Sequence, residues 1–114
     1  MNVKDGIDPE TFRAASREAD ALLKALSNRH RLLIVCELLN GKKSVGQLAQ
    51  ALGVRSSTAS QHLALLRREG IISGERNGHT VWYRITSKPA AEMMKSLYAS
   101  CCSLSQLRNT TKEK

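Results

Sequence analysis

Hydrophobic residues recur at helical spacing along most of the chain. In segment 9–26 the steps between apolar residues alternate between three and four, which predicts a helix with a narrow apolar seam. The seam consists of Phe12, Ala15, Ala19, Leu22 and Leu26. Asp8 and Pro9 mark the start of this helix, because an aspartate side chain caps free backbone N–H groups and proline suits the first helical position.

Three shorter helices follow, each with recognisable end signals. We expect them over residues 28–40, 44–52 and 56–69. Asn28 can cap the first, and Ser44 with Gln47 forms a possible capping box for the second, which ends before Gly53. The apolar face of the first is expected to comprise Leu32, Leu33, Cys36 and Leu39.

After Gly70 the spacing of apolar residues changes from the helical period to every second position. The runs IISGE and TVWYRIT are typical of short β-strands, and RNGH joins them. Asn77 and Gly78 favour a tight hairpin turn, because both residues tolerate positive φ. We expect Val81, Tyr83 and Ile85 to face inward.

Pro89 opens a last helix that we expect to reach about Leu104. It carries a second seam of three-and-four steps, formed by Ala90, Met94, Leu97, Cys101 and Leu104. Neither seam has an internal partner of its own length, so the sequence predicts a homodimer through the first and last helices. We expect a flexible N-terminus over residues 1–7, one domain over 8–104 and a flexible tail over 105–114.

The order of helices and hairpin predicts a mainly α fold with a small β-hairpin wing, a winged helix-turn-helix. The expected core face of helix 56–69 carries Leu63 and Leu66, and its other face carries short, polar, uncharged side chains. Such side chains can approach base edges closely, and the amide of Gln61 could read adenine. The candidate DNA-binding residues on this helix are Ser56, Ser57, Thr58, Ser60, Gln61 and His62.

Net charge supports a nucleic-acid partner. The 114 residues include 18 Lys and Arg against 10 Asp and Glu, which gives a formal net charge of +8. Basic residues near the helix-turn-helix are expected to bond phosphates of double-stranded DNA. These are Lys42, Lys43, Arg55, Arg67 and Arg68, with Arg76 and His79 at the hairpin tip. No apolar run is long enough to span a membrane and the start does not resemble a signal peptide, so we expect a cytoplasmic protein.

The runs LLKALSNRHRLLIVCELL, SVGQLAQALGV, SSTASQHLALLRREGII and TVWYRI together resemble the ArsR family of bacterial winged-helix repressors. The resemblance implies a homodimer that binds a palindromic operator and is released by an inducer. The family's metal-sensing branch carries a Cys-x-Cys pair on the third helix, where this chain reads KKSVGQL. We therefore expect no metal ligands and no cofactor.

The chain is most similar to the sulfide- and persulfide-sensing branch of the family, the SqrR, BigR and HlyU type. Those proteins carry one cysteine in the second helix and one near the end of the last. Cys36 matches the first position, and the pair Cys101–Cys102 falls at the second. The resemblance implies a dithiol switch between Cys36 and Cys102, with Cys101 as the alternative partner. Arg29, His30 and Arg31 are candidates for a positive charge that favours a thiolate at Cys36.

Other interpretations stay open at this point. Cys36 alone could be a small core residue. The same fold could respond to peroxide or electrophiles through a disulfide, or to a metal through an improvised thiolate site. From another class, the protein could be a thiol carrier enzyme, although no acid-base residues surround the cysteines in the sequence. We expect a transcriptional repressor and not an enzyme.

Overall fold

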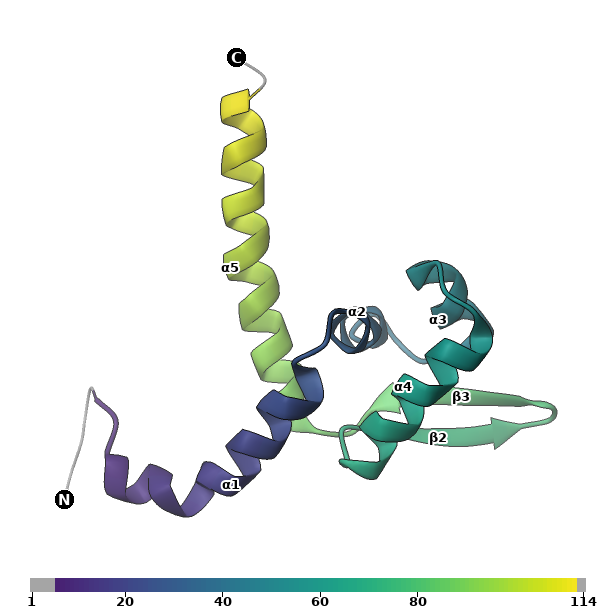
Figure 1. Cartoon of the computed structure of the whole chain (residues 1–114), viewed down its shortest axis with the longest axis horizontal. Helices are drawn as coiled ribbons and strands as arrows, with labels where there is room; N and C mark the ends of the chain where they lie inside the picture. Colours follow the sequence, from purple (N-terminus) through teal and green to yellow (C-terminus); the bar gives the residue numbers. More distant parts are fainter. Residues whose placement is uncertain (1–5, 113–114) are drawn as a thin grey trace.

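The computed structural model describes the backbone of residues 6–112 and the side chains of residues 6–102. Figure 1 shows five helices and a small sheet, with α1 and α5 extending away from a middle built by the other elements. In chain order the elements are α1 (Pro9–Leu26), α2 (Arg29–Leu38), β1 (Lys43–Ser44), α3 (Val45–Leu52), α4 (Ser56–Arg68), β2 (Ile72–Asn77), β3 (Thr80–Ile85) and α5 (Lys88–Lys112). The predicted winged helix-turn-helix architecture is confirmed.

The helix starts follow the local signals in the sequence. The Asp8 side chain accepts a hydrogen bond from the backbone N–H of Glu10, and that of Asn28 accepts one from Arg31. Ser44 and Gln47 bond each other's backbone N–H groups, so the capping box of α3 is formed in full. These caps fix where α1, α2 and α3 begin.

The sheet contains a strand that the sequence did not reveal. Its order is β1-β3-β2, and the two-residue strand β1 pairs Lys43 with Tyr83. The predicted turn position was wrong by one residue, because Asn77 belongs to β2 and pairs with Thr80. Gly78 has φ 69°, whereas His79, the next turn residue, has no positive φ. Positive φ is therefore needed only at the first turn position, as in a type II′ hairpin.

The core lies where α2, α3, α4 and the sheet meet the ends of α1 and α5. Its buried members include Leu26, Ile34, Val35, Leu38, Leu48, Leu63, Leu66, Ile71, Ile72, Ala90 and Met94. The predicted face of α2 was partly correct, because Leu32, Cys36 and Leu39 pack against the core but Leu33 does not. Ile34 and Val35 are fully buried, whereas Leu33 is 39% exposed and Cys36 is half-buried. Tyr83 and Ile85 pack against the core as expected.

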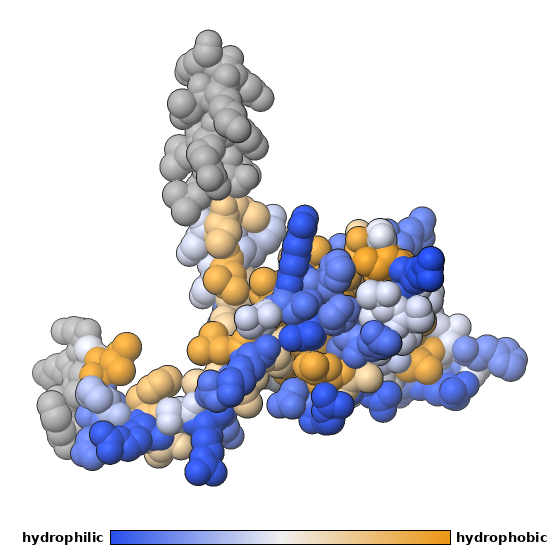
Figure 2. Space-filling view, in the orientation of Figure 1, coloured by the Kyte–Doolittle hydropathy of each residue, from blue (hydrophilic) through white to orange (hydrophobic). Residues whose placement is uncertain are grey.

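Both projecting helices expose apolar side chains. Figure 2 shows hydrophobic surface along α1 and on the described side chains of α5. The large exposed residues include Phe12 (53%), Leu23 (56%), Leu97 (40%) and Tyr98 (60%). The helix α5 continues to Lys112, so its predicted end near Leu104 was too early. Side chains beyond residue 102, including the seam position Leu104, lie outside the described residues, and a flexible tail stays a prediction.

No helix within the described range is long and apolar enough to cross a membrane.

Candidate functional site

The recognition helix α4 has two clearly different faces. Ala59, Leu63 and Leu66 are buried, and they hold the helix against the core. The opposite face exposes Ser56, Ser57, Ser60, Gln61 and Ala64, while Thr58 and His62 are half-buried. Because the exposed side chains are short and uncharged, this face can approach the edges of base pairs. DNA contact by these residues stays a prediction.

The start of α4 also suits an anion. Arg55 occupies the N-cap position, and no described side chain caps the free N–H groups there. Such groups at a helix N-terminus are donors for phosphate oxygens. Arg67, near the end of α4, is exposed, and so are Arg76 and His79 on the hairpin of β2 and β3 seen in Figure 1.

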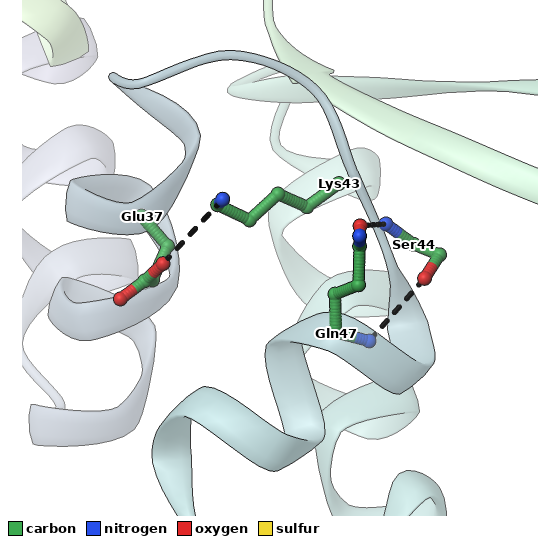
Figure 3. A network of polar contacts seen from close by, with 4 residues as sticks. All are labelled: Glu37, Lys43, Ser44 and Gln47. Carbon is green, nitrogen blue, oxygen red and sulfur yellow. Dashed lines mark hydrogen bonds and ion pairs between the residues drawn. The ribbon is translucent and has the colours of Figure 1, made fainter.

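Lys42 and Lys43 precede α3 and differ in their surroundings. Lys42 is exposed, whereas Lys43 lies in β1 and its Nζ is 3.8 Å from Oε1 of Glu37 on α2. Figure 3 shows this ion pair beside the capping box of Ser44 and Gln47. Lys42 is therefore free to reach a phosphate, whereas the ammonium group of Lys43 is already paired with the carboxylate of Glu37.

Sequence reasoning missed a polar link that joins three helices. Arg31 on α2 donates from Nε to the backbone carbonyl of Ala25 at 2.6 Å, close to the end of α1. Its Nη1 lies 3.4 Å from Nδ1 of His62 on α4. Because a guanidinium only donates, Nδ1 of His62 accepts this bond and the ring is neutral.

The surroundings of His62 also favour its neutral form. Its ring also meets the ring of His30, with centroids 5.4 Å apart in an edge-to-face arrangement. Burial lowers the pKa of His62, and the charges of Arg31 and His30 lower it further. His62 thus links α4 to Arg31 on α2, and its Nε2 remains available as a donor.

The three cysteines occupy different environments, and all are free thiols. Cys36 and Cys102 are half-buried, whereas Cys101 is exposed. Burial is the largest cause of the raised pKa of the Cys36 thiol. The negative charges of Glu37 and of Cys102 raise this pKa further. Cys102 therefore lies near enough to contribute to the electrostatics of Cys36, whereas Cys101 is not among the causes of the shift in pKa. The helices that carry them, α2 and α5, pack against each other.

The expected activation of Cys36 by neighbouring cations was wrong. The charged groups that act on it are anionic, and its pKa is raised, which lowers its thiolate fraction at neutral pH. Arg31 points instead to the α1 carbonyl and His62. Among the residues that the structure describes, no group of three His, Cys, Asp or Glu side chains could hold a metal ion.

Comparisons with known proteins agree with this fold and surface. The family model described as "Bacterial regulatory protein, arsR family" matches residues 22–73. The chain is 40% identical over 93 residues to the biofilm growth-associated repressor of Xylella fastidiosa, with 82% of each protein covered. It is also 40% identical over 91 residues to the transcriptional activator HlyU of Vibrio cholerae, which covers 80% of this chain and 84% of that protein.

A solved structure extends the agreement to three dimensions. The crystal structure of the transcriptional repressor BigR from Xylella fastidiosa matches with a TM-score of 0.78 and 39% identity, covering 82% of this chain and 95% of that one. These similar proteins are transcriptional regulators and not enzymes. The chain belongs to the arsR family of bacterial regulatory proteins and is a DNA-binding transcriptional regulator.

Proposed function

We propose that the protein is a homodimeric repressor that leaves its operator when reactive sulfur species link Cys36 to Cys102. The DNA-binding half of the proposal is supported by the uncharged exposed face of α4 and by the basic residues around it. The dimer is supported by the exposed apolar side chains of α1 and α5, which the described part of one chain leaves uncovered.

The observation that carries the switch is the packing of α2 against α5, each of which brings one half-buried thiol, Cys36 and Cys102. It supports an intrachain pair made of one thiol from α2 and one from α5. It also favours Cys102 over the exposed Cys101 as the partner. Since burial and two anionic neighbours disfavour the Cys36 thiolate, we assign the first attack to Cys102 and the closing step to Cys36.

The chemistry needs no oxidant beyond the sulfur donor. The Cys102 thiolate attacks the sulfane sulfur of a persulfide R–S–SH, the S–S bond breaks, and the thiolate RS⁻ leaves. A second transfer, from a second donor to the deprotonated persulfide, gives Cys102–S–S–SH. The Cys36 thiolate then attacks the inner of the two added sulfur atoms, and HS⁻ leaves. The product is a trisulfide bridge, and each S–S bond that breaks is replaced by one that forms.

Bridging would act on DNA through the dimer. The two recognition helices must stand about 34 Å apart to enter successive major grooves on one face of B-DNA. Helix α5 carries both Cys102 and part of the proposed dimer surface, so tying it to α2 shifts that spacing. Coupling of about 1–3 kcal/mol, or roughly 5- to 150-fold in affinity, is the usual size of such effects.

Mass spectrometry of the reduced protein treated with sodium tetrasulfide tests the bridge directly. We expect a peptide containing Cys36 to be joined to one containing Cys102 through at least one added sulfur atom, in wild type and in Cys101→Ser. Hydrogen peroxide is the matched oxidant. If peroxide alone forms the same link as a plain disulfide while tetrasulfide adds no sulfur, the inducer is an oxidant. If neither reagent links Cys36, the switch is excluded.

A further inference from the structure

A basic hollow lies at the junction of α2, the end of β3 and the first turns of α5. Its volume is about 450 Å³, and its walls include Leu39, Ala91 and four cationic side chains. The cations are Lys42, Arg84, Lys88 and Lys95. No carboxylate lines the hollow, and the ion pairs found among residues 6–102 involve Asp20 with Lys24 and Lys43 with Glu37. Four positive charges therefore face one open hollow without local compensation, which favours an anionic ligand.

The hollow lies between α2 and α5, the same two helices that carry Cys36 and Cys102, although neither thiol lines it. Lys88, Lys95 and Cys102 follow one another at intervals of seven residues, so they lie on one face of α5. Lys95 is about 10 Å from Cys102 along the helix axis, from a rise of about 1.5 Å per residue. Leu39, the C-cap residue of α2, lies three residues after Cys36, and both side chains are half-buried against the core.

Apart from Lys42, which is also a candidate phosphate contact, the residues that line the hollow lie outside the predicted DNA-reading surface. None of its lining residues comes from α3, α4 or the hairpin tip. A ligand held there would instead lie along the contact between α2 and α5, which carry the two thiols.

We propose that the hollow binds the sulfur donor, and that the donor is a persulfide whose carrier bears carboxylates remote from its sulfur. This inference rests on the proposed function. The spacing sets the requirement: a carboxylate bound by Lys95 must be separated from the sulfane sulfur by about the 10 Å that separates Lys95 from Cys102, and Lys88, about two helical turns farther from the thiol, adds positive charge at the far end of the site. A peptide-sized persulfide such as glutathione persulfide meets this requirement, whereas a small uncharged or cationic persulfide does not.

Rates of sulfur transfer to Cys102 provide the first test. Glutathione persulfide and cysteamine persulfide deliver the same sulfur, but only the first carries carboxylates. In Lys88→Gln/Lys95→Gln we expect the second-order rate constant for glutathione persulfide to fall about three- to tenfold, since exposed ion pairs are each worth a few-fold. The rate for cysteamine persulfide should change less than twofold. Arg13→Gln/Arg17→Gln removes the same net charge from two exposed positions on α1 and should leave both rates unchanged.

Two outcomes of this experiment would overturn the inference. One is an equal loss with both donors in the lysine variant, and the other is an equal loss with glutathione persulfide in the arginine control. A measurement of operator affinity provides a third outcome that would overturn the inference. If the lysine variant lowers the slope of log affinity against log salt by about 1.8, the two lysines are phosphate contacts and not donor contacts.

A second measurement judges the hollow even if no sulfur is transferred. S-methylglutathione has the same carboxylates and no reactive sulfur. In NMR titrations of the wild type we expect saturable shifts of the backbone amides of Ala91 and Lys95, which Lys88→Gln/Lys95→Gln removes. Absence of saturable shifts would refute the hollow as a donor site. Failure of both persulfides to modify Cys102, with these shifts present, would refute the proposed function alone.

Discussion

Replacing Arg31 with lysine should loosen the recognition helix without changing the charge of the protein. Arg31 uses separate nitrogen atoms to bond the Ala25 carbonyl at 2.6 Å and His62 at 3.4 Å. A lysine carries its donors on a single nitrogen atom and cannot reproduce this fork. At most one of the two bonds survives the substitution.

The expected magnitude follows from those bonds. A hydrogen bond to a charged group contributes about 1.5–3 kcal/mol, and partial burial places the loss near the lower end. We expect the free energy of unfolding to fall by about 1–2 kcal/mol. Because His62 lies on the recognition helix, operator affinity should fall about three- to tenfold, which is about 0.6–1.4 kcal/mol.

Urea denaturation at fixed protein concentration and fluorescence anisotropy with operator DNA measure the two effects. Arg29→Lys is the matched control, because Arg29 is an exposed arginine on the same helix. It should stay within about 0.5 kcal/mol of wild type. Equal losses of unfolding free energy and operator affinity in the two variants would refute the role of Arg31 as the link between α1, α2 and α4. Wild-type stability and affinity in Arg31→Lys would refute it as well.

Three further predictions concern single side chains. Glu37→Gln removes an anionic neighbour that raises the pKa of Cys36, so iodoacetamide should alkylate Cys36 faster at pH 7; an unchanged or slower rate would contradict the electrostatic account. The lowered pKa of His62 contributes stability that is present above its unfolded pKa of about 6.5 and is lost as the pH falls; His62→Asn should flatten the decline in unfolding free energy between pH 7 and 5, and an unchanged profile would count against it. A Cβ at Gly74 would lie 3.0 Å from Cε1 of Tyr83, so Gly74→Ala should destabilise the protein by about 1–3 kcal/mol in urea denaturation, and neutrality would show that the ring can move.

The starts of α1, α2 and α3 were predictable because their signals are local. The capping side chains of Asp8, Asn28 and Ser44 bond backbone groups within three residues, so sequence alone specifies them. The recognition helix was equally accessible, since its buried leucines and exposed hydroxyl residues alternate with helical period.

Features that depend on distant partners were not predictable. Strand β1 is only two residues long and exists because Lys43 and Ser44 pair with β3. Apolar residues on successive positions of α2 surround the helix, so periodicity could not show that Ile34 and Val35 face the core. The contact between Arg31 and His62 joins positions 31 residues apart, and neither neighbourhood carries a signal for it.

The candidate thiol site was partly accessible. The family resemblance indicated Cys36 and a distal cysteine, but spacing alone left Cys101 and Cys102 both possible. The structure separates them by burial, because Cys101 is exposed whereas Cys102 is half-buried like Cys36, and the choice of Cys102 as the partner stays a prediction. The sign of the charge around Cys36 also required the structure, since Arg31 is near in sequence but is directed elsewhere.

Operator affinity before and after sodium tetrasulfide, measured by fluorescence anisotropy in wild type and in three single cysteine-to-serine variants, tests the central claim most directly. We predict that wild type and Cys101→Ser lose operator affinity by roughly 5- to 150-fold on treatment. Cys36→Ser and Cys102→Ser should keep the affinity of the untreated protein. The account is contradicted if tetrasulfide releases Cys36→Ser from the operator to the same extent as wild type. It is also contradicted if Cys102→Ser is released while Cys101→Ser stays bound.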